Sequence, residues 1–235
     1  MIGMPFYGRP TWEASKSVLL TPSRNQDLQV VAVKVANRSL LAYSFNELLC
    51  HALSLRDQGI ATHFAMIHSD IAPENWWVDK LWTEMRTHNA DLVSAVVPIK
   101  DHANYDQWRM NPNHFGRTST AVGSIEDPWK TPQYITMEDR NHLPETFGQQ
   151  DVCDDGQVLL VNTGLWLADL RRPWWNAFHF GILDRVTVDE KGHRTVDCRP
   201  EDWEMSRYLH AKGAKVMATW AVVLEHLGDG SWRNY

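Results

Sequence analysis

The chain has 235 residues, of which 43% are apolar and 22% are charged, a composition that excludes a disordered protein and favours a globular one. Its formal net charge of −6 argues against nucleic-acid binding by the whole surface, although residues 171–215 carry a small excess of basic residues. Three separated cysteines without a CxxC pair exclude a disulfide framework and a cysteine zinc site, and they favour a reducing, cytoplasmic location.

Strand and helix patterns alternate through the first hundred residues. Apolar runs predict strands at residues 2–8, 28–35, 62–71 and 92–99. Helix patterns lie between them, at residues 12–20, from a capping box at Ser44 and Glu47 to Gly59, and at residues 73–86. This alternation is typical of a largely parallel sheet with crossover helices, so we expect an α/β, Rossmann-like sandwich.

The second part of the chain is less regular. Residues 100–156 are rich in Asn, Pro, Asp, His and Gly and are predicted to form an irregular, functional insertion. A strand is then expected at residues 158–162, a helix from Pro200 to Gly213, and a last strand at residues 215–224. No repeat, linker or stretch near the roughly 20 apolar residues that span a bilayer is present, so we expect a single domain over residues 1–235 without a membrane span.

The run T-H-F-A-M-I-H-S-D-I at residues 62–71 ends in His-Ser-Asp. Because side chains on a strand alternate between its faces, we expect His68 and Asp70 on the same side at the carboxyl end. Open α/β sheets bind ligands at that edge. Ser69 and Asp70 could instead simply cap the helix that follows Pro73, which is the commoner role of such residues.

Further polar or aromatic residues stand at the ends of other predicted elements: Phe6, Tyr7, Arg38, Asn162, Gly164, Glu201, Asp202 and His226. The rings of Phe6 and Tyr7 could stack on a base and Arg38 could pair with a phosphate; a surface turn and a solvated loop arginine are the alternatives. Glu201 and Asp202 could simply favour the positive end of their helix, and a lone histidine after a strand is more often a surface residue. Their order along the chain is more informative than any one of them.

In this order the segments resemble those of GT-A glycosyltransferases, nearest in style to the large family-2-like group of nucleotide-sugar enzymes. F-A-M-I-H-S-D-I looks like the Asp-x-Asp-type motif that holds a divalent metal on the donor diphosphate, with Asp70 as its last aspartate and His68 in place of the first. L-L-V-N-T-G-L-W-L-A-D-L is similar to the strand and turn that line the sugar and acceptor pocket. The helix start where inverting members keep their general base resembles P-E-D-W-E-M-S-R-Y-L. The late segment that adds a third metal ligand resembles E-H-L-G-D-G-S-W.

The resemblance covers almost the whole chain except residues 101–156, which we expect to be a lid or acceptor loop. It implies a single GT-A domain in which residues 1–100 bind the nucleotide sugar and residues 101–235 bind the acceptor. The predicted activity is metal-dependent transfer of a sugar, UDP-linked in the donor, to an acceptor hydroxyl with inversion at the sugar.

The resemblance also assigns roles to single residues. Mn²⁺, or Mg²⁺, would be held by Asp70 and His226, with His68 on either the metal or the ribose. Asp202 would be the general base, with Glu201 orienting it, and we expect the helix start to keep Asp202 ionised at neutral pH. The remaining donor contacts would come from Pro5, Phe6, Tyr7, Arg38, His68, Asn162 and Gly164.

Two other functions fit parts of the pattern. A nucleotidyltransferase that makes sugar nucleotides shares the sheet and the metal, but the first strand lacks the Gly-rich, basic loop that cradles a triphosphate. A catalytically silent carbohydrate-binding protein is suggested by the 12 Trp and by His68 in the metal motif. The acceptor, whether a glycan, a small molecule or a hydroxylated base in nucleic acid, and the oligomeric state are not predicted.

Overall fold

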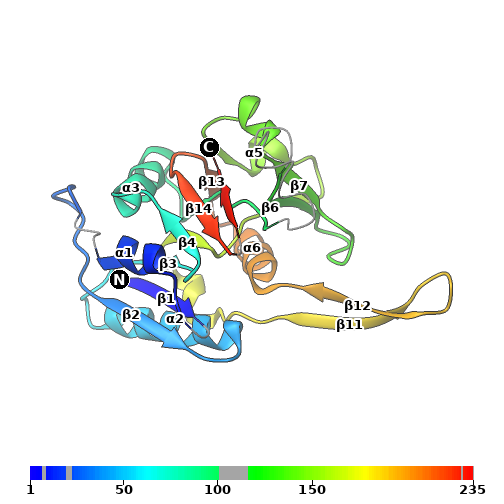
Figure 1. Cartoon of the computed structure of the whole chain (residues 1–235), viewed down its shortest axis with the longest axis horizontal. Helices are drawn as coiled ribbons and strands as arrows, with labels where there is room; N and C mark the ends of the chain where they lie inside the picture. Colours follow the sequence, from blue (N-terminus) through cyan, green and yellow to red (C-terminus); the bar gives the residue numbers. More distant parts are fainter. Residues whose placement is uncertain (7–8, 20–22, 101–115, 229, 235) are drawn as a thin grey trace.

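A mixed sheet of seven strands lies at the centre of the computed structural model, which describes residues 1–6, 9–19, 23–100, 116–228 and 230–234 (Figure 1). The strand order is β2-β1-β3-β10-β5-β13-β8. The bounds are β1 Ile2–Phe6, β2 Val33–Asn37, β3 His63–Ile67, β5 Leu92–Ala95, β8 Thr146–Gly148, β10 Leu165–Asp169 and β13 Val216–Thr219.

Five of these strands point the same way. β1 is parallel to both β2 and β3, and β13 is parallel to β5. β10 runs antiparallel between β3 and β5, and β8 is antiparallel to β13 at the edge. The expected α/β class with a mostly parallel central sheet is therefore confirmed, with two antiparallel strands supplied by the chain after residue 100.

Helices cover both faces of the sheet: α1 Trp12–Leu19, α2 Leu41–Asp57, α3 Trp77–His88 and α6 Glu201–Ala211. Phe64 and Met66 of β3 belong to one apolar cluster with residues of α2 and α6. Ala65 and Ile67 belong to a second cluster, with residues of α1 and α3. The alternation of side chains along a strand explains this division, because β3 is buried on both faces. No helix of the described residues is long and apolar enough to cross a bilayer.

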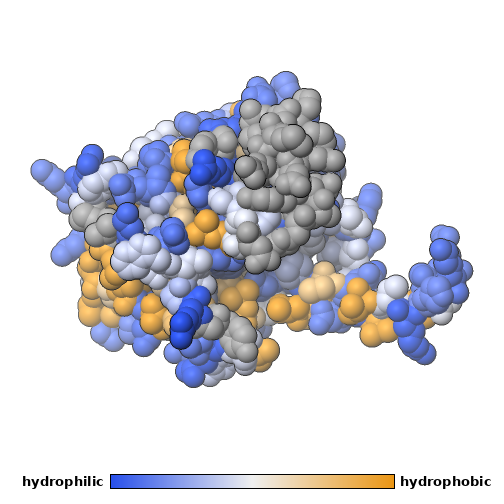
Figure 2. Space-filling model, in the orientation of Figure 1, coloured by the Kyte–Doolittle hydropathy of each residue, from blue (hydrophilic) through white to orange (hydrophobic). Residues whose placement is uncertain are grey.

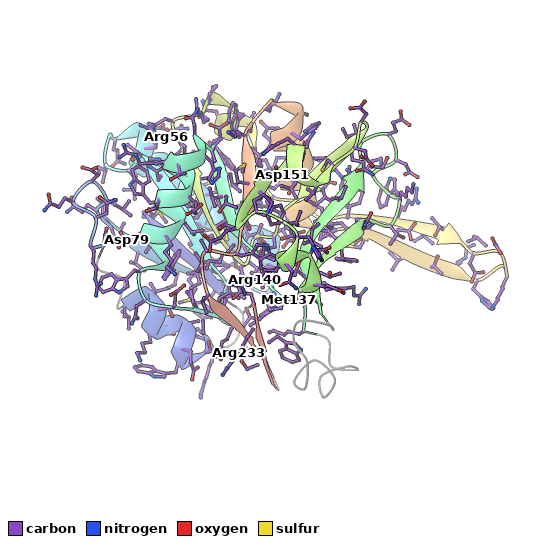
Figure 3. All side chains as sticks on the ribbon, turned by 90° about the horizontal axis from the view of Figure 1, so that it is seen from above. Arg56, Asp79, Met137, Arg140, Asp151 and Arg233 are labelled. Atoms are coloured by element: carbon purple, nitrogen blue, oxygen red, sulfur yellow. The ribbon has the colours of Figure 1, made fainter. Side chains whose placement is uncertain are left out.

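Smaller elements surround this core. Their bounds are β4 Ile71–Pro73, β14 Leu224–Leu227 and β15 Ser231–Arg233 in one sheet; β6 Arg117–Ser124, β7 Gln133–Thr136 and β9 Gln157–Leu160 in another; the hairpin β11 Leu183–Val188 and β12 Arg194–Arg199; α5 Gln149–Val152; and the short 3-10 helices Glu138–Asn141 and Pro173–Ala177. The hairpin stands away from the body in both the front view and the view from above (Figures 1 and 3).

Several expectations for the first hundred residues are wrong in their boundaries, and the strands predicted at residues 62–71 and 92–99 end already at Ile67 and Ala95. The strand predicted at residues 28–35 begins only at Val33, because only Val33–Asn37 pairs with β1. The capping box at Ser44 does not exist, since α2 begins at Leu41 and Ser44 lies buried inside it. Pro73 pairs with Leu224 in a strand rather than opening a helix, and α3 begins at Trp77.

The region after residue 100 is more regular than its composition indicates. Residues 101–115 lie outside the described residues, but residues 116–156 contain β6, β7 and β8, so the described part of the predicted insertion is not irregular throughout. The last predicted strand, at residues 215–224, is in fact two strands in different sheets, Val216–Thr219 and Leu224–Leu227. His226 therefore lies within a strand rather than after one.

Gly3 is required where α2 packs on β1. A Cβ atom at this position would lie 2.8 Å from Cε2 of Phe64 and 3.3 Å from Cδ1 of Leu48. Because both neighbours are fully buried, we expect Gly3→Ala to lower the free energy of unfolding by roughly 1–3 kcal/mol, the usual cost of overpacking. Urea denaturation measures this, with Gly181→Ala as the control, since a Cβ at Gly181 meets nothing within 4 Å. Equal unfolding midpoints for the two variants would contradict the expectation.

Candidate functional site

Several of the predicted site residues meet at the edge of the sheet where the parallel strands end. His68 and Asp70 follow β3, and Lys100 follows the extended segment after β5. Gly164 precedes β10, whose first residue, Leu165, pairs with Ile67. The backbone N–H of His68 donates to the carbonyl of Gly164 at 2.8 Å, which joins the two segments. The antiparallel direction of β10 therefore places its beginning beside the end of β3.

Asp70, Lys100 and His226 form one polar cluster. Nζ of Lys100 lies 2.5 Å from Oδ2 of Asp70, and Nε2 of His226 lies 3.4 Å from the same oxygen. β14 holds His226 there, because it pairs with β4 and the backbone N–H of Leu227 donates to the Asp70 carbonyl at 2.7 Å. Burial would raise the pKa of the Asp70 carboxyl, but His226 and Lys100 outweigh burial and hold this pKa well below its ordinary value. Asp70 is therefore ionised at neutral pH.

The orientation of the His226 ring bears on the predicted metal. Its Nδ1 lies 2.8 Å from the carbonyl oxygen of Pro98, and since a carbonyl only accepts, Nδ1 carries the proton. When the ring is protonated, Nε2 donates to the Asp70 carboxylate, and when the ring is neutral, Nε2 is an acceptor that faces it. Two acceptors at this separation need a proton or a cation between them.

One carboxylate oxygen and one imidazole nitrogen thus fit two positions of a divalent ion such as Mn²⁺. Among the residues that the structure describes, no group of three or more His, Cys, Asp and Glu could hold a metal. The ammonium of Lys100 contacts the same carboxylate oxygen and supplies a positive charge there. Metal binding by Asp70 and His226 therefore stays a prediction, and the two donor atoms are of a kind that suits it. The Lys100 ammonium would lie beside the ion or compete with it for Asp70.

His68 is placed behind this cluster. Its ring packs on Phe45 with 5.1 Å between the ring centroids. Burial, only partly opposed by Asp70, lowers the pKa of the imidazole to about 4, so His68 is neutral at physiological pH. Its Nε2 is buried and has no hydrogen-bond partner among the described residues, so one polar atom of this ring is left unpaired inside the fold.

Asn162 and Gly164 build the turn between β9 and β10. The Asn162 amide donates to the Ala95 carbonyl and accepts from the backbone N–H of Gly164, each at 2.8 Å. A Cβ at Gly164 would lie 3.1 Å from Oδ1 of Asn162 and 3.3 Å from Cγ2 of Val97. The amide of Asn162 is thus engaged with backbone, and its observed role is to fix the turn beside His68.

Glu201 and Asp202 open α6, as expected, with Pro200 before them. The expected ionisation of Asp202 is wrong. Burial, reinforced by the neighbouring Glu201 carboxylate, raises the pKa of Asp202 to about 8, although a hydrogen bond from the Trp203 backbone N–H opposes the shift. Burial also raises the pKa of Glu201. The helix start stabilises a carboxylate less than desolvation destabilises it here.

The structure places three of the remaining donor-binding candidates, Pro5, Phe6 and Arg38, in or directly after β1 and β2. Pro5 is buried in β1, and Phe6 is half-buried at its end, opposite Asn37. Arg38 follows β2 and donates through Nε to Glu47 at 2.8 Å, one strand further from β3. Tyr7 lies outside the described residues. Pro5, Phe6 and Arg38 lie toward the same edge of the sheet as Asp70, but no described contact joins them to it.

Lys100 belongs to the polar cluster with Asp70 and His226, and the sequence did not single it out. The signal for it was present, because it is the first charged residue after the apolar run 92–99, which ends at the same edge as β3. A cation at the carboxyl end of a parallel strand is as informative there as an aspartate.

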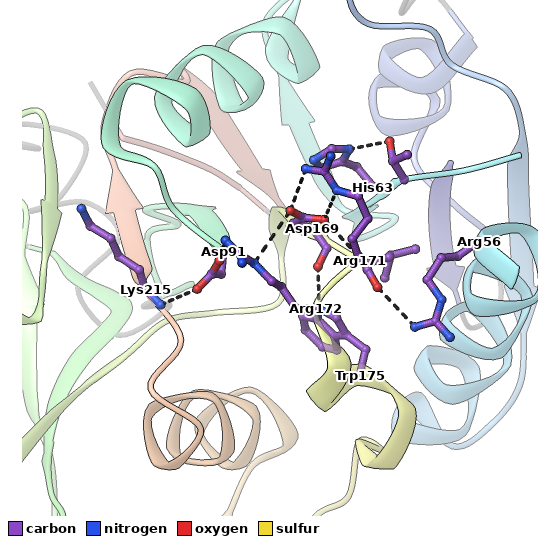
Figure 4. A network of polar contacts seen from close by, with 10 residues as sticks. Arg56, His63, Asp91, Asp169, Arg171, Arg172, Trp175 and Lys215 are labelled. Atoms are coloured by element: carbon purple, nitrogen blue, oxygen red, sulfur yellow. Dashed lines mark hydrogen bonds and ion pairs between the residues drawn. The ribbon is translucent and has the colours of Figure 1, made fainter. Parts of the chain in front are cut away.

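The opposite edge of the sheet carries a different polar network (Figure 4). Asp169 accepts from Nε of Arg171 at 2.8 Å, and Asp91 pairs with Arg172 at 2.6 Å and accepts from the backbone N–H of Lys215 at 2.8 Å. Each of these carboxylates is held by an arginine and by backbone N–H groups of neighbouring segments. The network ties together the ends of β5, β10 and β13, and we assign it a structural role.

Comparisons with known proteins give a fold and no family. No protein-family model and no curated protein matches the chain. Among solved structures it is similar to the "Crystal Structure of A197 from STIV", with a TM-score of 0.51 and 11% identity over 97% of this chain and 85% of that one. A mutant UDP-glucose pyrophosphorylase from Leishmania major in complex with UDP-glucose aligns with a TM-score of 0.33 and 9% identity, over 82% of this chain and 42% of that one. The first likeness shows a shared fold alone, and the second is too weak to carry an argument.

Proposed function

We propose that the chain is a glycosyltransferase of the GT-A type that transfers a sugar from a UDP-linked donor to an acceptor hydroxyl with inversion. The observation that carries the proposal is the meeting of Asp70, Lys100 and His226 where the parallel strands end. Three separate segments supply these groups. This edge is also where open α/β sheets bind their ligands.

The charges of this cluster suit a diphosphate leaving group. Transfer of the sugar leaves two negative phosphates behind, so positive charge placed beside them lowers the barrier. The Lys100 ammonium has three N–H donors, and Asp70 engages one of them. Asp70 and His226 would hold Mn²⁺, or Mg²⁺, which when bound neutralises and orients the diphosphate.

His68 and the turn beside it would border the donor. The unpaired Nε2 of His68 would bond a ribose or sugar hydroxyl once donor binding uncovers it, because the neutral ring can donate or accept at that atom. Asn162 and Gly164 hold the turn against His68, so they would shape a sugar site through the backbone. Pro5, Phe6, Tyr7 and Arg38 would lie toward the base and ribose.

Asp202 is the proposed general base, with Glu201 beside it. A base works best when its pKa is close to the working pH, and a pKa of about 8 meets this condition better than an ordinary aspartate does. The carboxylate would take the proton of the acceptor hydroxyl as the oxygen attacks the sugar. A glycan, a small molecule or a hydroxylated DNA base each presents such a hydroxyl.

Isothermal titration with UDP, UDP-sugars and other nucleotide sugars, each with Mn²⁺ and with a chelator, tests the proposal. We expect UDP and at least one UDP-sugar to bind, and the donor to be hydrolysed slowly in the absence of an acceptor. Lack of binding for every nucleotide sugar in both conditions would contradict the proposal. Formation of a sugar nucleotide from UTP and a sugar 1-phosphate would show a nucleotidyltransferase instead, and donor binding without hydrolysis would show a silent binding protein.

A further inference from the structure

The two faces of the β11–β12 hairpin differ in what covers them. One face carries Arg185 opposite Asp197 and Thr187 opposite Thr195. Arg185 and Asp197 form an ion pair at 2.9 Å, and the two threonine hydroxyls lie 2.9 Å apart. The indole of Trp129 packs against Arg185 on this face, 4.4 Å from the guanidinium to the ring centroid. This face is therefore satisfied within the chain.

The other face is an uncovered aliphatic stripe. Val186 pairs with Val196 across the hairpin, and Val188 follows on the same side. Their exposed fractions are 67%, 65% and 61%, although β-branched side chains of this kind normally pack against a neighbour. A two-stranded hairpin that projects from the body is also marginally stable by itself. Figure 2 shows apolar surface along the projecting arm.

The order of residues along the stripe is self-complementary. From base to tip its three cross-strand pairs are Asp184 with Cys198, Val186 with Val196, and Val188 with Arg194. When two such faces pack in opposite directions about a two-fold axis, the valine pairs meet at the centre. The cross-strand pair at the base of each hairpin then lies over the pair at the tip of the other hairpin. This brings Asp184 of each copy within reach of Arg194 of the other copy.

We infer that this stripe is the contact between two copies of the chain, packed antiparallel about a two-fold axis. Residues 183–199 contain four basic and four acidic residues, so their lack of net charge gives no attraction for nucleic acid or an anionic membrane. The opposite charges at the two ends of the stripe select a second hairpin in the reverse direction. Because β12 leads through Pro200 into α6, the contact would also fix the segment before Glu201 and Asp202.

Sedimentation velocity of the full chain over a wide range of concentration tests this inference. We expect a concentration-dependent dimer that Val196→Lys weakens by about tenfold or more, because the charge would be buried at the centre. Thr195→Lys, on the other face of the same strand, is the matched control and should dimerise like the parent. Circular dichroism shows whether both variants keep the fold.

Charge exchange tests the antiparallel direction. Asp184→Arg and Arg194→Asp should each weaken the dimer by placing like charges together, and the double variant should restore it. A parent that sediments as a monomer at every concentration would overturn the inference. A double variant as weak as the single ones would overturn it too, and neither result bears on donor binding.

Discussion

Replacing Asp70 by Asn should remove most of the affinity for UDP and UDP-sugars. The substitution keeps the size of the side chain but removes the negative charge that holds Lys100 at 2.5 Å and faces Nε2 of His226. Both a bound cation and the position of the ammonium depend on that charge. Loss of one partner in a charged, partly buried group costs roughly 2–5 kcal/mol, so the dissociation constant should rise by at least about tenfold.

Titration calorimetry of the Asn variant with UDP in Mn²⁺ measures this effect. Asp169→Asn is the matched control, because Asp169 is also an ion-paired carboxylate of the same sheet but lies at the opposite edge (Figure 4). We expect the control to lower stability and to leave UDP affinity within about twofold of the parent, since the two sites share no contacts. Equal UDP affinity of Asp70→Asn and the parent would remove the basis of the proposed function.

The sequence could place His68, Asp70 and Gly164 at one edge because strand direction alone brings them there. An apolar run that ends in polar residues marks the carboxyl end of a buried strand, and this reasoning is local. The pairing of His226 with Ile71 in a separate small sheet is not local. Only the family resemblance, and no periodicity, predicted that His226 would meet Asp70.

Other features depend on partners that a sequence does not name. Alternation at residues 28–35 predicts extended backbone, but β1 pairs with only the last part of it, Val33–Asn37. In the same way, loop-like composition after residue 116 concealed β6, β7 and β8, whose short strands are completed by distant ones. The alternation of strand and helix patterns therefore predicted the fold class, and tertiary pairing decided the boundaries.

The pKa of Asp202 is another property that the sequence alone could not predict. The helix start is visible in the sequence, and it predicts a lowered pKa for a carboxylate in the first turn. Burial of the side chain beside Glu201 is a tertiary property, and it reverses the direction of the shift. This correction leaves the proposed function of Asp202 unchanged, but it changes the expected pH dependence of the activity.

Asp202→Asn should therefore lower turnover and raise stability at the same time. The amide cannot accept the proton of an attacking hydroxyl, so turnover should fall by roughly 10²–10⁴-fold, the usual contribution of a general base. Parent turnover should rise with pH up to about 8, where Asp202 ionises, and the variant should lose this rise. Donor affinity should barely change, because the substitution is outside the Asp70 cluster.

The expected gain in stability follows from the direction of the shift. The pKa of Asp202 is higher in the folded chain than in the unfolded one, so the folded state binds the proton more tightly. The resulting stability is fully present below about pH 4, near the unfolded pKa, and is lost as the pH rises through about 8. Asn stays neutral throughout, so Asp202→Asn should exceed the parent in Tm by several degrees at pH 8, at about 2–4 °C per kcal/mol for a chain of this size, and match it at pH 4.

Donor hydrolysis by water needs the same proton acceptor and so gives the turnover of both proteins before an acceptor is known. Thermal unfolding at several pH values gives the second readout. Glu204→Gln is the matched control, since Glu204 is an acidic residue of the same first turn that pairs with Arg199 at 2.5 Å; we expect this variant to keep its turnover and to gain no stability. An Asp202→Asn variant with near-parental turnover, or NMR of a product that shows a retained anomeric configuration, would rule out Asp202 as the base of an inverting transfer.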